Sequence, residues 1–413
     1  MRLHRAQGLA TTLFLSALTL PVLAAPAVAQ VDQGVFDNHK AYWHNYNVDP
    51  LQGLVWSEDS STLYLLNQSG ARLVSYDVGR SATVWEMPIG PGASNLVRRP
   101  GTQELWIPDR VTSVITVVDL DLRTVVASIP VGKEPHGLDF TPDGQRAYVS
   151  CSADDQVDVI DTATRQVVHS IDIPAREPRG LLYLDGSIYV ASHLSGNASA
   201  PISAPGSKGE GAAIDIVDTN NTPGLTPLPD RDLFRIAITA SPTTDHLDPS
   251  WTRSGVGTIL FNLNRAHGDD LMWVANLDSL NAQFKGEAAF IEGQVVRNRL
   301  ALVSTDGATA HTQIDLDALI PDANARCAPP TGVAMNATGT RAYVCGYGSS
   351  NVTVLGIDGA TTTWIGEIQI VQNRSNPSVS LTDGQNGAGP RTCVVSPNGA
   401  HLAVLNSGES SFS

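Results

Sequence analysis

Basic residues are scarce in this sequence. Its 413 residues include 26 Lys and Arg against 41 Asp and Glu, which gives a formal net charge of −15 and a pI of about 5.0. Such a chain is repelled by polyanions, so nucleic acid and anionic membrane surfaces are excluded as main partners. Hydrophobic residues make up 42% of the chain, which is enough for a buried core.

Cysteine and familiar catalytic motifs are also scarce. The four cysteines form no C-x-x-C pair, and no C-x-x-C-H motif for covalent haem is present. The G-x-S-x-G, H-E-x-x-H and P-loop motifs are missing too. We therefore assign no catalytic residues and no metal ligands, and we expect no cofactor within this chain.

Long hydrophobic runs are missing except at the N-terminus. Arg2 and Arg5 precede the apolar stretch LATTLFLSALTLPVLAA, and a small-residue A-V-A cleavage site ends at Ala29. The sequence predicts a signal peptide over residues 1–29 that is cleaved after Ala29. The mature protein, with a formal charge of −17, is predicted to be periplasmic or secreted and not inserted in a membrane.

Turn residues are abundant, with 36 Gly and 25 Pro, and one strand pattern recurs. An aromatic residue within a short apolar segment returns every 41 or 42 residues, and the pattern continues at wider spacing. The positions are Tyr64, Trp106, Tyr148, Tyr189, Trp273, Tyr343 and, without an aromatic ring, Ala403. This periodicity indicates a repeat architecture in which these side chains fill the layer between units.

Each regular unit is predicted to contain four strands. In the third unit the strand HGLDF is followed by the turn TPDG and by the strands RAYVS, QVDVIDT and VVHSIDIP. Four strands in about 42 residues make one propeller blade. We predict an all-β chain, a seven-bladed β-propeller of four-stranded antiparallel blades over residues 49–413, preceded by an N-terminal extension at 30–48. The last blade is truncated, so we expect the chain to be a fragment.

Three stretches interrupt the repeat and are predicted to be surface loops. They lie at residues 194–211, 239–255 and 277–303, and the first is rich in Gly, Ser, Pro and Ala. Long loops on a rigid ring are common carriers of binding specificity.

The segments RAYVSC…VDVIDTATRQVV and RAYVCG…NVTVLGIDG resemble the YVTN β-propeller repeat. The resemblance implies an exported binding protein, akin to the haem propeller of periplasmic nitrite reductases and to bacterial lactonase propellers. The segment beginning VGTILFNLNRAHGDDLMWVANLDSLN resembles a blade of exported propellers fused to a dihaem, cytochrome c peroxidase-like domain. That resemblance implies haem in a domain beyond residue 413.

Polar residues recur where the first strand of a blade begins and where the antiparallel second strand ends, which is the same rim of the ring. We call this set the channel-mouth collar. It consists of Gln52, Asn67, Ser94, Asp109, His136, Arg179, His193, Asn276, Asp278, Arg391 and Asn406.

The collar has two interpretations. As a ligand site, Arg179 and Arg391 would hold a carboxylate or phosphate, and His136 or His193 would carry a proton or ligate a metal or haem. Alternatively, the collar is polar only because a channel mouth is wet. The partner predicted for a functional collar is a small anionic ligand or a protein.

The cysteines allow one disulfide prediction, since an exported protein tolerates disulfides. Cys327 precedes the first strand of blade six and Cys345 ends its second strand, so both reach the same rim and are predicted to pair. Cys393 aligns with core positions and is predicted to be a buried thiol, while Cys151 lies too far around the ring to join them.

Three functions remain open from the sequence. The first is a binding or scaffold module without catalytic residues of its own. The second is the propeller part of a periplasmic redox enzyme with haem beyond residue 413. The third, lactone hydrolysis, lacks a recognisable metal constellation.

Overall fold

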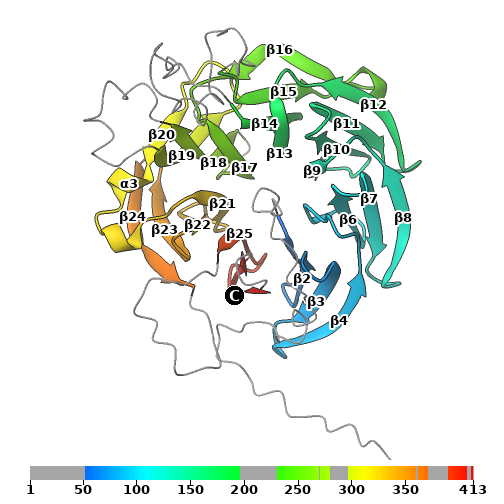
Figure 1. Cartoon of the computed structure of the whole chain (residues 1–413), viewed down its shortest axis with the longest axis horizontal. Coiled ribbons are helices and arrows are strands. Elements are labelled where there is room, and N and C mark those ends of the chain that lie inside the picture. Colours follow the sequence, from blue (N-terminus) through cyan, green and yellow to red (C-terminus); the bar gives the residue numbers. More distant parts are fainter. Residues whose placement is uncertain are drawn as a thin grey trace, which may run out of the picture.

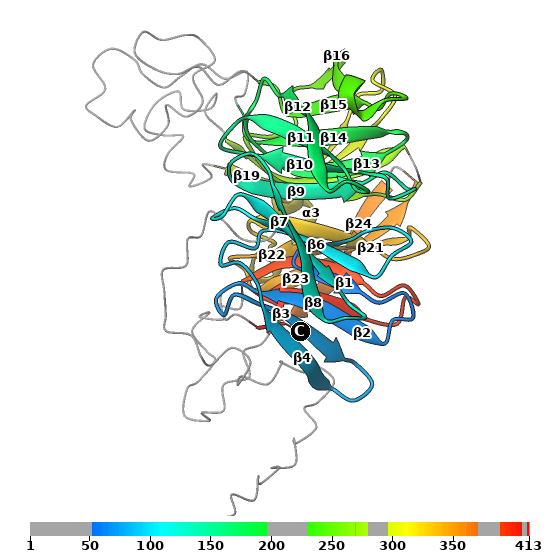
Figure 2. The same cartoon turned by 90° about the vertical axis from the view of Figure 1, so that its right-hand side faces the viewer.

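The computed structural model describes residues 52–195, 230–268, 270–279, 296–359, 361–370, 389–406 and 411–412. The predicted signal peptide and N-terminal extension lie outside these residues. The described strands form antiparallel sheets that follow one another around a ring (Figure 1). The edge-on view in Figure 2 shows these sheets within one disc. The structure therefore confirms an all-β, propeller-like ring of four-stranded blades.

Three four-stranded sheets open the ring, each in chain order from the inside outward. Their strands are β1 (Leu54–Trp56), β2 (Thr62–Asn67), β3 (Arg72–Asp77), β4 (Ala82–Pro88), β5 (Val97–Arg98), β6 (Glu104–Asp109), β7 (Val114–Asp119), β8 (Thr124–Pro130), β9 (Pro135–Phe140), β10 (Arg146–Cys151), β11 (Gln156–Asp161) and β12 (Gln166–Asp172).

An eight-stranded sheet follows, in which β13–β16 and β17–β20 are joined by one pairing of Leu194 with Ile259. Its strands are β13 (Arg176–Leu184), β14 (Ser187–Leu194), β15 (Leu233–Ala237), β16 (His246–Arg253), β17 (Ile259–Arg265), β18 (Leu271–Ser279), β19 (Val296–Ser304) and β20 (Thr312–Asp315).

A four-stranded and a three-stranded sheet end the described chain. They comprise β21 (Pro330–Met335), β22 (Arg341–Gly346), β23 (Asn351–Asp358), β24 (Thr361–Gln369), β25 (Pro390–Val395), β26 (Leu402–Asn406) and β27 (Ser411–Phe412). The short helices are η3 (Pro242–Thr244), α3 (Leu316–Leu319) and η5 (Ala323–Ala325). None of the described helices has the length and apolar composition of a membrane span.

The hydrophobic core lies between neighbouring sheets. Trp106 on β6 meets Phe140 on β9 edge to face, with ring centroids 5.2 Å apart, and Tyr148 packs with β14 and β15 in the next layer. The ring closes where Tyr76 contacts Phe412 and where Trp56 Nε1 donates to Val394 O at 3.2 Å. The predicted role of the repeated aromatic position, filling the layer between units, is confirmed.

One predicted loop is wrong in part. Within residues 239–255 the structure contains η3 and the outer strand β16, which pairs with β15. The sequence HLDPSWTR has proline and two charged residues, yet outer strands face solvent and tolerate both. Most of the predicted loops 194–211 and 277–303 lies outside the described residues, although the C-terminal end of the latter forms part of β19.

The glycine that follows His136 is required by close packing of the innermost strands, which Figure 1 shows nearest the centre of the ring. A Cβ atom on Gly137 would lie 2.2 Å from Arg179 O and 2.8 Å from Leu181 Cβ on β13. A Cβ atom on Gly332 of β21 would likewise lie 2.8 Å from the carbonyl oxygen of Arg391 on β25. The repeated glycine thus lets one inner strand approach the next.

Replacing Gly137 with alanine is therefore expected to lower the free energy of unfolding by about 1–3 kcal/mol, because β9 and β13 must separate. Gly366→Ala on the outer strand β24 is the matched control, since a Cβ there meets nothing within 4 Å. Urea unfolding of both variants measures the difference. Equal stabilities would contradict the assignment of Gly137 to inter-strand packing.

Candidate functional site

His136 is the most unusual member of the channel-mouth collar. It lies on the innermost strand β9, its exposed fraction is 1%, and neither ring nitrogen has a hydrogen-bond partner. Burial lowers the pKa of His136 well below 6.5, and the nearby cations Arg179 and Arg110 together with His193 lower it further. His136 is therefore a neutral imidazole with both polar atoms unused.

Arg179 extends from β13 of the next blade. Its side chain is 12% exposed, and Nη2 donates to Glu177 Oε2 at 2.6 Å. Burial lowers the pKa of Arg179, while the carboxylates of Glu177 and Glu134 act in the opposite direction. The carbonyl oxygen of Arg179 accepts a 2.8 Å bond from Ser150 Oγ on β10, which fixes the backbone below the guanidinium.

His193 is the penultimate residue of β14 and lies near Arg179. Its Nδ1 is 3.1 Å from Leu260 O, and because a carbonyl can only accept, Nδ1 carries the proton. Burial lowers the pKa of His193 to about 3, with Arg179 as the next cause and Arg391 as a lesser one. At neutral pH this second imidazole is also uncharged.

Arg391, on β25, completes the cationic side of the collar. Its guanidinium carbon lies 3.7 Å from the centroid of the Tyr347 ring, just beyond the end of β22. A cation stacked on an aromatic face is held in place, with its N–H groups directed along the edges of the guanidinium plane. We call Arg110, His136, Arg179, His193 and Arg391 the cationic cluster.

Sequence reasoning missed two residues, Arg110 and Tyr347. Each directly follows the end of a second strand, one position after the collar residue Asp109 in one case and after Gly346 in the other. The strand-end rule that selected Asp109 could have found them if it had been extended by one residue. Both residues act on the site through interactions with residues of other blades, and the repeat sequence does not encode those interactions.

Several collar residues hold the backbone instead of facing a ligand. Asp109 Oδ1 accepts from the Val111 and Thr112 amides at 2.9 and 3.1 Å, and Asn67 Oδ1 accepts from the Gly70 amide at 2.9 Å. These bonds close the turns after β6 and β2. For Asp109 and Asn67 these bonds favour the interpretation of the collar as polar without being a ligand site.

Ser94 and Asn276 are bonded to the backbone as well. Ser94 Oγ donates to Pro135 O at 2.7 Å and so links the second sheet to the third. Asn276 Nδ2 donates to Val274 O at 3.1 Å. Asn406 is buried at the end of β26.

Asp278 is paired outside the cationic cluster. Its carboxylate binds Arg299 on β19 at 2.5 Å, and burial raises the pKa of Asp278 despite this partner. Asp278 is thus neutralised within its own sheet by Arg299 and contributes no free carboxylate to a ligand site.

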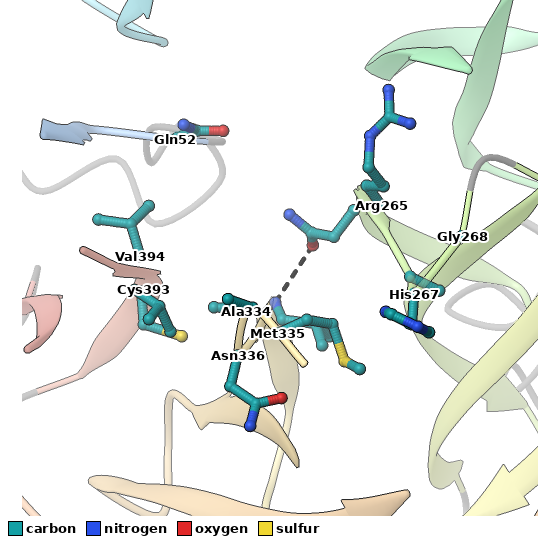
Figure 3. Close-up of a pocket in the computed structure, with 14 residues that line it drawn as sticks. Gln52, Arg265, His267, Gly268, Ala334, Met335, Asn336, Cys393 and Val394 are labelled. Atoms are coloured by element: carbon teal, nitrogen blue, oxygen red, sulfur yellow. Dashed lines mark hydrogen bonds between the residues drawn. The ribbon is translucent and has the colours of Figure 1, made fainter. Parts of the chain in front are cut away.

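Gln52 lines a separate cavity of about 460 Å³ (Figure 3). The walls come mainly from the inner strands β17, β21 and β25, and the bond from the Val333 amide to Asn264 Oδ1, 3.2 Å long, crosses one side. The Asn336 side chain in the wall is already bonded to Arg341, Thr338 and Thr340. The side-chain amides of Asn264 and Asn336 in the wall are therefore already engaged within the protein.

The described part of the chain contains no group of three or more His, Cys, Asp or Glu side chains placed to hold a metal ion. His136 and His193 are the two histidines of the cationic cluster, and both lie near Arg179, whose charge lowers their pKa values in addition to burial. The donor set therefore favours an anion over a metal cation at this rim.

The predicted Cys327–Cys345 disulfide is not formed, and both residues are buried thiols. Along β22 the side chains alternate between the two faces of the sheet. Val344 packs with Cys327 on one face, whereas Cys345 packs with Cys393 on the other. The prediction overlooked that the sheet separates the two thiols.

Comparison with known proteins supports the fold. No protein-family model matches the chain, and no curated protein matches it. A chain of Kuenenia stuttgartiensis hydrazine synthase aligns with a TM-score of 0.68 and 20% identity, covering 90% of this chain and 98% of that one. Staphylococcus aureus virginiamycin B lyase aligns with a TM-score of 0.56 and 12% identity, covering 89% and 94%. At these identities the similarity shows a β-propeller fold alone, and the YVTN resemblance stays a prediction.

Proposed function

We propose that this protein is an exported β-propeller that binds a small anion bearing a carboxylate or phosphate group at the cationic cluster. The observation that carries the proposal is His136, a buried imidazole with two unpartnered nitrogens that lies near two arginines and a second histidine. A buried polar group without a partner costs about 1–3 kcal/mol. A ligand oxygen that accepts the His136 N–H would remove that cost.

The charges around His136 and His193 suit an anion. Arg110, Arg179 and Arg391 supply three positive charges, and the carboxylates of Glu177 and Glu134 offset part of them through Arg179. The chain as a whole carries −15, so this cluster is a local exception on an acidic molecule. Partly buried arginines form short, charge-assisted bonds with oxyanions, which gives selectivity as well as affinity.

The proposal includes a seven-bladed ring. Seven clusters of buried side chains occur among the described residues, each between consecutive groups of strands, including one between β13–β16 and β17–β20. The eight-stranded sheet then consists of two blades linked by the single Leu194–Ile259 pairing. Export is proposed from the signal-like residues 1–29.

A second candidate is the propeller part of a larger redox enzyme, and the alignment with a hydrazine synthase chain is compatible with it but supports it only weakly. Sequencing the reading frame beyond Ser413 tests it, because C-x-x-C-H motifs there would supply covalent haem. In that case the cationic cluster would face a domain of the same polypeptide.

Replacing His136 with leucine provides the sharpest test of the first candidate. We expect the affinity for inorganic phosphate or citrate, measured by isothermal titration calorimetry at constant ionic strength, to fall about tenfold. The unliganded variant is expected to be more stable than wild type by about 1 kcal/mol, because an unpartnered polar group has been removed. His169→Leu on the outer strand β12 is the control and should leave the affinity unchanged.

The pH dependence of stability gives an independent readout for the same variant. Because the pKa of His136 is lowered in the folded state, its contribution is fully present above about 6.5 and is lost as the pH falls below that value. The leucine variant should therefore lose less stability than wild type between pH 7 and pH 5. No measurable binding of either anion by wild type would overturn the proposed function.

A further inference from the structure

Two thiols meet across the boundary between the sheet β21–β24 and the sheet β25–β27. Cys345 on β22 is fully buried and Cys393 on β25 is 3% exposed, and both belong to one cluster with Val352, Ile370 and Val404. Cys393 Sγ lies 3.5 Å from Tyr343 O, so this sulfur reaches the strand that carries Cys345. Successive side chains of a strand point to opposite faces, so residues 343 and 345 of β22 share one face, which is the face toward Cys393.

The other two cysteines lie elsewhere. Cys327 Sγ contacts Val344 O at 3.8 Å on the opposite face of the same sheet. Cys151 Sγ lies 3.6 Å from Asp158 Oδ2 in the third sheet. The geometry therefore singles out one pair among four cysteines.

We propose that Cys345 and Cys393 form a disulfide that links β22 to β25 when the protein folds under oxidising conditions. Both thiols lie in the layer of buried side chains between these two sheets. A bond between them would close a long loop of chain and would stabilise the folded ring mainly by restricting the unfolded state.

The crosslink would also bear on the cationic cluster. Arg391 lies two residues before Cys393 on β25, and Tyr347 lies two residues after Cys345 beyond β22. The disulfide would thus tie together the two strands that place the Arg391 guanidinium over the Tyr347 ring. The crosslink itself does not depend on the proposed function.

The oxidant is a low-molecular-weight disulfide. One cysteine loses its thiol proton, and its thiolate attacks a sulfur of the oxidant, forming a mixed disulfide and releasing one thiolate of the oxidant. The second cysteine then loses its proton and attacks the first cysteine's sulfur, forming the Cys345–Cys393 bond and releasing the second thiolate. Two electrons and two protons pass from the pair to the oxidant. Burial raises the pKa of Cys345 well above 9, so the reaction is expected before the sheets close and not in the folded protein.

Peptide mapping decides the pairing, because trypsin places each cysteine on its own peptide. Cleavage after arginine gives residues 147–165 with Cys151, 327–341 with Cys327, 342–374 with Cys345 and 392–413 with Cys393. The protein is unfolded and refolded with oxidised and reduced glutathione, alkylated and digested without reductant. We expect peptide 342–374 linked to 392–413, with Cys151 and Cys327 alkylated. A link between 327–341 and 342–374, or alkylation of all four cysteines, would overturn the proposal.

Thermal unfolding of variants provides a second, independent readout. Refolded wild type is expected to lose about 5 °C of melting temperature on reduction, as for a crosslink that closes a long loop. Cys345→Ser and Cys393→Ser should each abolish this difference, whereas Cys327→Ser should retain it. Equal melting temperatures of oxidised and reduced wild type would show that the linked strands gain nothing from the bond. Peptide mapping does not require that either variant fold or that any anion bind.

Discussion

Replacing Asp245 with alanine is expected to lower the free energy of unfolding by about 3–5 kcal/mol, because it leaves Arg146, whose side chain is only 16% exposed, without its carboxylate. Asp245 is fully buried between the third blade and the segment that leads into β16. Arg146 Nη1 donates to Oδ1 at 3.0 Å, Tyr148 Oη donates to Oδ2 at 2.8 Å, and the Thr239 amide donates to Oδ1 at 2.7 Å. Burial raises the pKa of Tyr148, and Asp245 raises it further, so the phenol stays protonated as the donor.

Chemical unfolding in urea at neutral pH measures this loss. The matched control is Glu86→Ala, which breaks a half-exposed pair with Arg72 at 3.1 Å and should cost about 1 kcal/mol or less. Asp245→Asn keeps the shape but removes the charge, so its stability should fall between alanine and wild type. If the Asp245 and Glu86 alanine variants lose the same free energy of unfolding, the hydrogen bonds around Asp245 do not stabilise the third blade as proposed.

The hydrogen bonds around Asp245 matter for the site because Arg146 and Tyr148 lie on the same strand, β10, as Ser150. Ser150 Oγ accepts from the Gly137 amide at 2.8 Å and donates to Arg179 O at 2.8 Å, so one hydroxyl joins the strands of His136 and Arg179. The N-terminal half of β10 is thus fixed by Asp245, and its C-terminal end is fixed by the bonds of Ser150 to the backbones of residues 137 and 179. Stability of the blade and geometry of the site depend on the same strand.

The blade itself could be predicted from sequence because its determinants are local and repeated. Tyr148 and Trp106 recur at a fixed spacing within apolar segments, and each occupies the layer between sheets. The expected strand HGLDF corresponds to β9, and RAYVS to β10. Alternation and turn residues are sufficient for such elements, since neither depends on which blade is adjacent.

The cationic cluster could be predicted only in part, because its geometry depends on contacts between blades. His136, Arg179, His193 and Arg391 were found from their positions at the rim, but Arg110 was not. Whether a rim side chain faces the ligand or closes its own turn is decided by hydrogen bonds such as those of Asp109. The cysteine pairing failed for a related reason, since the two faces of β22 cannot be assigned to neighbours until the ring is assembled.

Replacing Arg179 with glutamine is expected to lower the affinity for inorganic phosphate by about 10- to 100-fold, the usual loss for one charge-assisted bond. Arg179 is the leading charged cause of the lowered pKa values of both His136 and His193. Its loss should therefore raise both histidine pKa values toward 6.5, which NMR titration of the imidazole resonances detects. The fold should persist, because Ser150 Oγ bonds the backbone oxygen of residue 179, which the substitution leaves in place. Glu177, the carboxylate partner of the Arg179 guanidinium, is 40% exposed and remains solvated without it.

Arg72→Gln is the matched control, since Arg72 is paired with Glu86 on the surface of the first blade, with a side chain 37% exposed. It should leave both phosphate binding and the two histidine pKa values unchanged. Raised histidine pKa values with unaltered phosphate affinity would show that Arg179 shapes the electrostatics of the rim without binding the anion, and the ligand site would then have to be sought elsewhere. If the phosphate affinity and the two histidine pKa values both change in Arg179→Gln but not in Arg72→Gln, the histidines and the bound anion both depend on the charge of Arg179.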